Sequence, residues 1–187
     1  MDERTAKLTI ILGFNGTGKT TLLENLLLEN KRRSLIITPD DSEEVWLKYP
    51  ENELKTKADF LFTGIQRHIF NPKKEFGTLA NLKYFKKGII IFDDCRGYLK
   101  AATAEEIRQL LIRRRQRMVD VFAVGHGFTE VPPVFFTFAS DFILFRTVDN
   151  IRKRKDCLRD FDRIASETDA VNRTAVKNPH FFKHIKF

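Results

Sequence analysis

Short apolar runs alternate with longer polar and amphipathic segments along most of the chain. Five runs are continuous stretches rich in β-branched and aromatic residues, the pattern of strands buried on both faces of a sheet. They are residues 7–12, 34–38, 88–93, 119–124 and 142–145. Residues 19–30 place four leucines on one helical face, and residues 103–117 open with a helix-capping pattern, Thr-Ala-Glu-Glu. Strands that alternate with helices predict an α/β domain with a mainly parallel central sheet flanked by helices.

Two parts of the chain show a weaker pattern. Residues 40–87 contain a short strand at 68–70 and a helix near 78–85. After about residue 150, the sequence indicates one helix and a loose end. We therefore divide the chain into a core of residues 1–150 and a basic C-terminal helix and tail of residues 151–187.

Residues 13–20 carry a long motif between a predicted strand and a predicted helix. Gly13-Phe14-Asn15-Gly16-Thr17-Gly18-Lys19-Thr20 fits the phosphate-binding pattern G-x-x-x-x-G-K-[ST] at every fixed position. The glycines let backbone N–H groups surround the phosphates, while Lys19 reaches the β and γ oxygens and Thr20 ligates Mg²⁺. The helix N-terminus adds its dipole and its unpaired N–H groups. The motif predicts binding of ATP and Mg²⁺ through Gly13, Asn15, Gly16, Thr17, Gly18, Lys19, Thr20 and Thr21.

Two carboxylates stand at the end of the third apolar run. Residues 88–93 end at Asp93, and Asp94 follows directly. In an open parallel sheet, ligands bind at the carboxyl ends of the strands. Asp93 is therefore the candidate Walker B residue that holds Mg²⁺, and Asp94 is the candidate that orients or deprotonates a water molecule. Taken alone, the two residues fit a strand that ends in a turn, and the upstream phosphate-binding motif favours the catalytic interpretation.

The composition fits one folded domain. The chain has 187 residues, 42% of them hydrophobic and 18 of them Phe, and no stretch approaches the roughly 20 apolar residues of a membrane span. Cys95 and Cys157 are the only cysteines and lack metal-ligand spacing. The N-terminus leads into the first strand without a signal peptide. We therefore expect a cytoplasmic protein without a transmembrane segment.

Positive charge is concentrated in two places. The net charge is +8, with a cluster of Arg113, Arg114, Arg115 and Arg117 at a predicted helix end. Residues 151–187 hold ten Lys and Arg against five Asp and Glu. A solvated surface explains these charges as well as a nucleic-acid contact does.

The segment after the Walker B strand resembles one superfamily of motors. An Arg-rich helix end leads into a strand followed by His126, then Pro132-Pro133, then Phe142-Ile143-Leu144-Phe145-Arg146. With the two Walker motifs, this layout resembles the FtsK-HerA superfamily, particularly the small viral genome-packaging ATPases and the zonular-occludens-toxin-like phage assembly ATPases. The resemblance spans roughly residues 6–148. It implies a single P-loop NTPase domain of the RecA-like (ASCE) type.

The resemblance also implies roles for the site residues. Lys19 and Thr20 bind phosphate and Mg²⁺, and Asp93 coordinates the metal through water. Asp94 stands where the family usually has a catalytic Glu, a departure that shortens the carboxylate by one methylene. His126 stands where such motors carry a polar sensor, although a structural histidine fits equally well. The candidates for an arginine finger acting on a neighbouring subunit are Arg113, Arg114, Arg115, Arg117 and Arg146.

The implied function is an ATP-hydrolysing motor that translocates DNA while packaging or extruding a viral genome. Such a motor forms a homo-oligomeric ring, contacts DNA phosphates without sequence specificity, and works with a capsid portal or membrane vertex protein in the host cytoplasm or at the virion. Two alternatives stay open. They are a small nucleoside or nucleotide kinase, whose usual size this chain has, and a non-catalytic nucleotide-dependent assembly switch. An ABC-type ATPase is disfavoured because the sequence has no Leu-Ser-Gly-Gly-Gln-like signature.

Overall fold

One central sheet organises the chain, whose computed structural model describes residues 6–39, 44–71, 75, 77–97 and 104–187. Within these residues the sheet has seven strands in the order β3-β2-β4-β5-β1-β6-β7. They are β1 (Leu8–Leu12), β2 (Ser34–Thr38), β3 (Ile65–Ile69), β4 (Gly88–Phe92), β5 (Val119–Gly125), β6 (Asp141–Leu144) and β7 (Lys183–Lys186). All pairings are parallel except that of β7 with β6. The predicted α/β class and mainly parallel sheet are confirmed.

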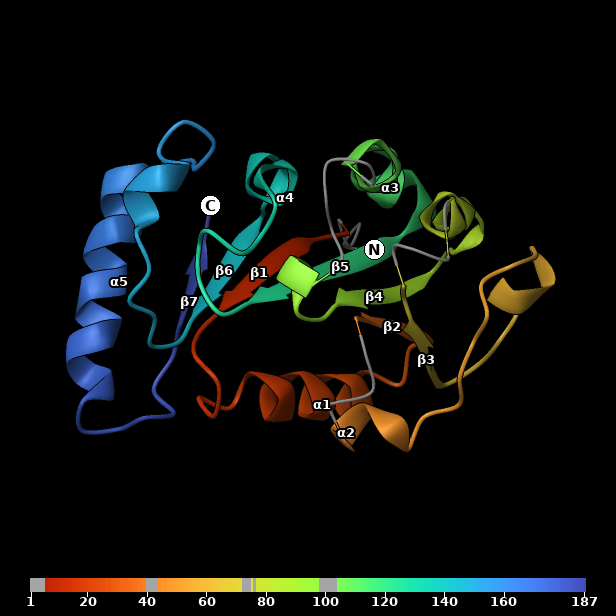
Figure 1. Ribbon diagram of the computed structural model, residues 1–187, viewed down its shortest axis with the longest axis horizontal. Coiled ribbons are helices and arrows are strands. Elements are labelled where there is room, and N and C mark those ends of the chain that lie inside the picture. The colour runs from red at the N-terminus through yellow and green to blue at the C-terminus, as the bar shows by residue number, and fades with distance from the viewer. Residues whose placement is uncertain (1–5, 40–43, 72–74, 76, 98–103) are drawn as a thin grey trace, which may run out of the picture.

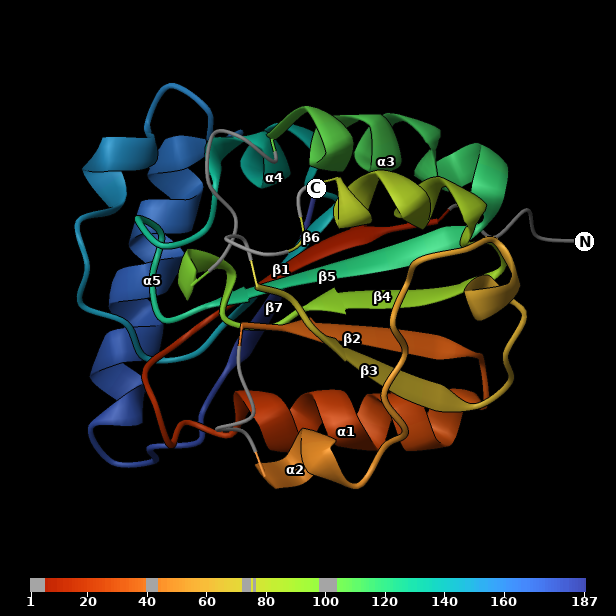
Figure 2. The same ribbon diagram turned by 45° about the vertical axis from the view of Figure 1, so that its right-hand side comes forward.

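Helices cover both faces of the sheet (Figure 1). One face carries α1 (Lys19–Asn30) and α2 (Glu44–Leu47). The other carries the 3-10 helix η2 (Thr78–Tyr84), α3 (Ala104–Arg117) and α4 (Pro133–Phe138), with α5 (Phe161–Ala175) at the β7 end of the molecule (Figure 2). Short 3-10 turns complete the described elements: η1 (Ala58–Phe60), η3 (Cys95–Gly97) and η5 (Ile151–Arg154).

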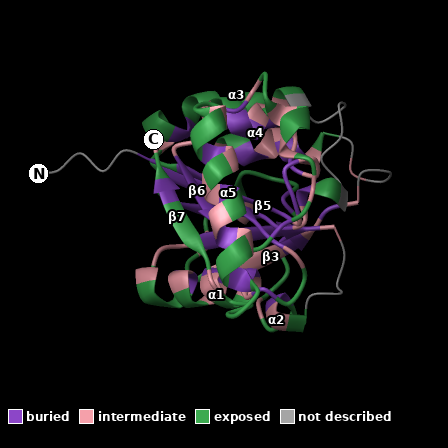
Figure 3. Ribbon diagram, turned by 90° about the vertical axis from the view of Figure 1, so that its left-hand side faces the viewer, coloured by how far each residue is buried: buried purple, intermediate pink, exposed green. Residues whose placement is uncertain are grey.

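The buried side chains divide between the same two faces. Leu23 and Leu27 of α1 and Trp46 of α2 belong to one hydrophobic cluster. A larger cluster joins α3, α4 and α5 to the opposite face. Figure 3 shows the buried strands between helices whose outer surfaces are exposed. This packing explains why the five continuous apolar runs form central strands, since burial on both faces favours apolar residues at every position.

The strand order brings the two sequence motifs to the same edge of the sheet. β5 lies between β1 and β4, with Val121 paired to Leu8 on one side and to Ile90 on the other. β1 leads into the loop of residues 13–18, and β4 leads into Asp93 and Asp94. Because these strands are parallel, their carboxyl ends face the same space.

Some elements differ from the sequence prediction. β3 begins at Ile65 and not at residue 68, and residues 78–84 form a 3-10 helix. The sequence did not predict α4. The expected loose end is wrong for residues 183–186, which form β7 with Ile185 opposite Phe142. The division at residue 150 stays a prediction, although β7 is hydrogen-bonded to the sheet of the first part.

Membrane-spanning character is absent from the described helices. None of them has the length and the apolar composition that crossing a membrane requires.

Candidate nucleotide-binding site

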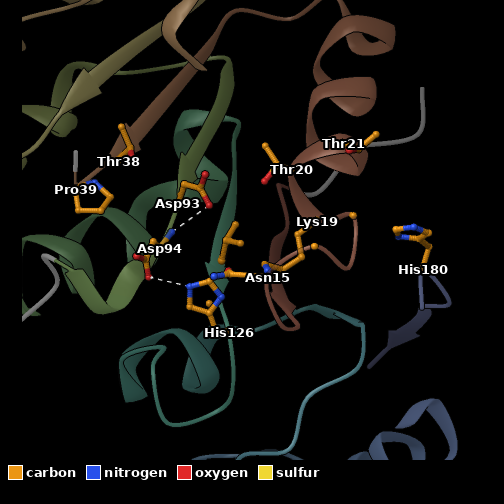
Figure 4. A pocket seen from close by; sticks show the side chains of 14 residues that line it. Asn15, Lys19, Thr20, Thr21, Thr38, Pro39, Asp93, Asp94, His126 and His180 are labelled. Atoms are coloured by element: carbon orange, nitrogen blue, oxygen red, sulfur yellow. Dashed lines mark hydrogen bonds and ion pairs between the residues drawn. The ribbon is translucent and has the colours of Figure 1, made fainter. Parts of the chain in front are cut away.

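A cavity of about 380 Å³ opens at the carboxyl edge of β1, β2, β4 and β5 (Figure 4). It is lined by Asn15, Gly16, Gly18, Lys19, Thr20, Thr21, Thr38, Pro39, Asp93, Asp94, Val124, Gly125, His126 and His180. Of the eight predicted phosphate-binding residues, only Gly13 and Thr17 are not in this lining. The structure therefore brings both motifs and His126 to one space.

The loop of residues 13–18 is held in shape by hydrogen bonds within the loop and by the segment that follows β6. The N–H of Phe14 donates to the carbonyl of Arg146 at 2.9 Å, and the hydroxyl of Thr17 donates to the carbonyl of Phe14 at 2.8 Å. A Cβ atom at Gly13 would lie 2.4 Å from the Cβ of Phe145, so a larger residue cannot fit. Gly18 has φ of 99° directly before α1, a conformation that favours glycine.

Lys19 lies inside this loop at the start of α1. Its Nζ donates to the carbonyls of Gly13 at 2.7 Å and Phe14 at 2.9 Å, and the residue is only 8% exposed. The helix N-terminus and the ammonium group together make this side of the cavity positive. Figure 4 shows Lys19, Thr20 and Thr21 on the α1 side and the two aspartates across the cavity.

Asp93 is a buried carboxylate whose position depends on a tryptophan. The indole Nε1 of Trp46 donates to Oδ2 of Asp93 at 2.5 Å, and the N–H of Asp94 donates to Oδ1 at 3.1 Å. Both Asp93 and Trp46 are buried. A carboxylate facing the hydroxyl of Thr20 offers hard oxygen ligands, so these residues fit the Mg²⁺ that accompanies a triphosphate.

Asp94 and His126 face each other in the cavity (Figure 4). Oδ1 of Asp94 lies 3.8 Å from Nε2 of His126, and the side chains are 42% and 32% exposed. That separation is too long for a direct hydrogen bond, and it leaves both groups available to one ligand in the cavity. His126 is fixed through its backbone, because its N–H donates to Glu130 at 3.2 Å and its carbonyl accepts from the hydroxyl of Thr147 at 3.1 Å.

Cys95 follows the two aspartates but has no chemical role in this arrangement. Its side chain is fully buried, and its thiol contacts the carbonyl of Phe92 at 3.4 Å. Burial, with a smaller effect of the nearby carboxylates, raises the pKa of this thiol far above its ordinary value. A thiol that stays protonated is a poor nucleophile and a poor metal ligand.

The arginine candidates do not enter the cavity of their own chain. Arg113, Arg114, Arg115 and Arg117 stand at the end of α3, before β5 begins, and so at the opposite edge of the sheet. Seven residues of strand separate the two edges, a distance of roughly 20 Å. Arg146 follows β6 on the cavity side, and its side chain is exposed.

Arg114 differs from the other four candidate arginines because its guanidinium is buried and donates hydrogen bonds to backbone carbonyls. It donates to the carbonyls of Leu111 at 2.8 Å and Phe138 at 3.2 Å, and the residue is 5% exposed. Burial lowers the pKa of Arg114. These contacts join α3 to the end of α4 and favour a structural role.

Sequence reasoning missed three residues at the cavity or directly behind it. Trp46 was visible as the single tryptophan, but its partner Asp93 is 47 residues away. Glu130 holds His126 and accepts from Arg96 at 2.8 Å. His180 lies across the loop, with Nδ1 at 3.3 Å from the carbonyl of Thr17. The residues around His180 carry no motif, so no sequence signal marks it.

Comparisons with known proteins point to one fold. No family model matches the sequence, and neither does any curated protein sequence. Similar solved structures include the genome-packaging NTPase B204 of Sulfolobus turreted icosahedral virus 2 in complex with AMP, with 14% identity, TM-score 0.66, and coverage of 100% of this chain and 98% of that chain. They also include B204, the DNA-packaging ATPase of Sulfolobus turreted icosahedral virus, with 15% identity, TM-score 0.65, and coverage of 96% and 97%.

A shorter match is the N-terminal domain of zonular occludens toxin from Neisseria meningitidis, with 19% identity, TM-score 0.44, and coverage of 74% of this chain and 76% of that chain. The two B204 structures match this chain along nearly its whole length. The chain therefore has the P-loop ATPase fold of the viral genome-packaging NTPases, as its motifs predict.

Proposed function

We propose that this chain is a Mg²⁺-dependent ATPase that translocates DNA and packages a viral genome as a ring-shaped oligomer. The observation that carries the proposal is the convergence of Lys19, Thr20, Asp93, Asp94 and His126 on one cavity at the carboxyl edge of the sheet. The fold shared with B204 along the whole chain supports the same conclusion.

The geometry suits hydrolysis of a terminal phosphate. The loop N–H groups and Lys19 bind the phosphate oxygens, while Thr20 and Asp93 would hold Mg²⁺. When bound, the ion neutralises charge on the β and γ oxygens. Asp94 and His126 stand 3.8 Å apart, where they hold and polarise the attacking water. Water attack on the γ-phosphorus gives ADP and phosphate.

The position of the arginines supports a ring. Arg113, Arg115 and Arg117 cannot reach the cavity of their own chain across the sheet, and Arg146 lies exposed beside it. An arginine from a neighbouring subunit therefore completes the site, and hydrolysis moves one subunit against the next. The net charge of +8 supports DNA as the partner. A capsid portal or membrane vertex protein would receive the ring in the host cytoplasm or at the virion.

Replacing Lys19 with alanine tests the hydrolysis. We expect Lys19→Ala to lower phosphate release from ATP by about 10²-fold or more, because the charge that stabilises the transferring phosphoryl group is lost. The measurement is the steady-state ATPase rate with and without duplex DNA, over a range of salt concentrations. The wild type should be stimulated by DNA and inhibited by salt, and the exposed Lys177→Ala should match it. DNA-independent phosphate transfer to a nucleoside would instead identify a kinase.

A further inference from the structure

Six cationic side chains line one hollow at the amino edge of the sheet, on the opposite side from the nucleotide cavity. The hollow measures about 480 Å³. We call it the basic groove, and its cations are Lys57, Lys83, Lys86, Lys87, Arg113 and Arg117. They come from the loop before η1, the end of η2, the turn before β4, and the end of α3. The other residues that line it, Tyr84 among them, are uncharged.

No salt bridge pairs the cations of the basic groove within the described part of the protein, and the carboxylates of Glu105 and Glu106 line the adjoining hollow with Lys83, Arg113 and Arg117. Elsewhere on this edge, Arg32 pairs with Asp120, and Lys7 lies 3.4 Å from Asp141. Among the described residues, none of the six groove cations forms a salt bridge. Burial, and then the charge of Arg113, lower the pKa of Arg117. Like charges held this close are stabilised by an anionic ligand.

The backbone holds these cations together. The N–H of Lys87 donates to the carbonyl of Arg117 at 2.9 Å, which ties the turn before β4 to the end of α3. Lys87 and Met118 both adopt left-handed conformations, with φ of 54° and 55°, directly before their strands. Such conformations are uncommon for residues other than glycine. The groove is therefore fixed by the fold, unlike a solvated run of charges on a tail.

We propose that the basic groove binds the phosphate backbone of DNA. The proposal rests on the proposed function for the identity of the polymer, and it adds the surface that holds it. Arginine forks and lysine point charges both suit phosphate, and the half-buried Tyr84 adds a ring beside the cations. A lipid surface fits less well, since Met118 is the only large exposed apolar side chain of the lining.

One strand joins the groove to the nucleotide cavity. α3 ends at Arg117 in the groove, and Met118 leads from there into β5. β5 returns from Met118 to Gly125 and His126. Phosphates bound by Arg113 and Arg117 thus act at the start of the strand that places Gly125 and His126 in the cavity. With these two arginines assigned to DNA, Arg115 and Arg146 are the exposed candidates for the finger.

Two triple variants with equal charge test the groove. The first is Lys83→Gln, Lys86→Gln and Lys87→Gln, and its control is Lys153→Gln, Lys155→Gln and Lys177→Gln, three exposed lysines of the C-terminal part. Each lowers the net charge from +8 by three. Binding of a fluorescent duplex is measured by anisotropy without nucleotide, from 50 to 200 mM salt.

We expect the groove triple to bind at least tenfold more weakly at 100 mM salt and the slope of log Kd against log salt to fall by about 3. The control should stay within threefold of the wild type. Equal losses in the two triples would show that net charge alone attracts DNA and would overturn the proposal. Wild-type binding to anionic phosphatidylserine vesicles without binding to DNA would overturn it in favour of a membrane.

The ATPase rate separates this proposal from the proposed function. The groove triple should keep the basal rate and lose the stimulation by DNA, with an unchanged melting temperature as the control for folding. A wild type that hydrolyses ATP but does not bind duplex would contradict DNA binding by the groove and would leave ATP hydrolysis supported. A wild type that binds duplex through the groove without hydrolysing ATP would support DNA binding and contradict the proposed ATPase.

Discussion

At the scale of single residues, Asp93 shows how a buried charge is prepared for a ligand. Its carboxylate lies inside the fold and receives hydrogen bonds from the indole of Trp46 and the N–H of Asp94. Both donors fix the direction of the carboxylate before any ion binds. The indole is a neutral donor, so it orients the carboxylate without neutralising the negative charge that attracts Mg²⁺.

We expect Trp46→Phe to weaken Mg²⁺-dependent hydrolysis while keeping most of the packing. Loss of the indole N–H leaves a buried carboxylate oxygen without that donor, which costs about 1–3 kcal/mol of unfolding free energy. The Mg²⁺ concentration for half-maximal ATPase activity should rise severalfold. Tyr49→Phe is the control, because its hydroxyl lies 3.5 Å from Glu24, and neither residue is in the cavity lining. The role fails if Trp46→Phe and the wild type need the same Mg²⁺ concentration.

Cys95 gives a prediction about stability at alkaline pH. Below about pH 8.5 the thiol is protonated in both the folded and the unfolded chain. Above that pH the unfolded chain loses the proton first, because burial raises the pKa of the folded thiol. The unfolding free energy should then fall by up to about 1.4 kcal/mol per pH unit through this group.

Cys95→Ala removes the titration and leaves the other groups in place. We expect the stability difference between this variant and the wild type to shrink as pH rises from 7 to 10, measured by urea unfolding at each pH. A difference that is the same at every pH would show that the thiol does not contribute.

At the scale of elements, the sequence predicts what is buried on both faces and misses what depends on a neighbour. The apolar runs of β1, β4 and β5 are unambiguous because every position of these strands is buried. In β7, only Ile185 of Lys183-His184-Ile185-Lys186 is buried, so no apolar pattern exists. In β3, only His68 is buried, and its ring nitrogens contact the carbonyl of Asn52 and the carboxylate of Glu75.

In the candidate site, too, the sequence predicts the residues that belong to motifs and misses those that depend on a neighbouring element. Lys19, Thr20 and Asp93 sit in motifs whose spacing encodes their chemistry, so the sequence could place them. His180 reaches the cavity only because β7 pairs with β6 and Phe182 packs against Phe145 at 5.1 Å between ring centroids. Local sequence does not contain that information.

The C-terminal segment therefore carries a prediction of its own. We expect His180→Ala to weaken binding of a fluorescent ATP analogue about fivefold, the equivalent of one hydrogen bond of ~1 kcal/mol, without lowering the melting temperature of the free protein. The control is His184→Ala, an exposed histidine of β7 that is not in the cavity lining. If the wild type and His180→Ala bind the ATP analogue with equal affinity, His180 does not contribute to nucleotide binding and the C-terminal segment has only a structural role.

At the scale of the whole molecule, the two edges of the sheet carry two different candidate sites. The carboxyl edge holds the nucleotide cavity, and the amino edge holds the basic groove. In the ring that we propose, the edge or side of one subunit would meet the cavity of the next.

Mixed oligomers test this arrangement. A Lys19→Ala subunit has an inactive nucleotide cavity but still supplies an arginine finger to its neighbour. A subunit whose finger arginine is replaced keeps an intact cavity that needs an arginine from another subunit. We expect a mixture of Lys19→Ala with Arg115→Ala or with Arg146→Ala to exceed the summed ATPase rates of its parts, since a finger is worth about 10³- to 10⁵-fold. If no such mixture shows a gain, and mixtures with Arg113→Ala and Arg117→Ala show none either, the shared site is wrong.

The cavity joins the loop of residues 13–18 to His180, and this span has a consequence for synthesis. During translation the phosphate loop emerges early, but β6, β7 and His180 follow only after well over a hundred further residues. The leading strand β1 must meanwhile wait for β5 and β6, its neighbours on both sides. Contacts so distant in sequence form slowly. A ribosome-bound chain stalled before residue 119 should therefore expose an apolar β1, and one stalled before residue 180 still lacks the histidine that contacts the phosphate loop.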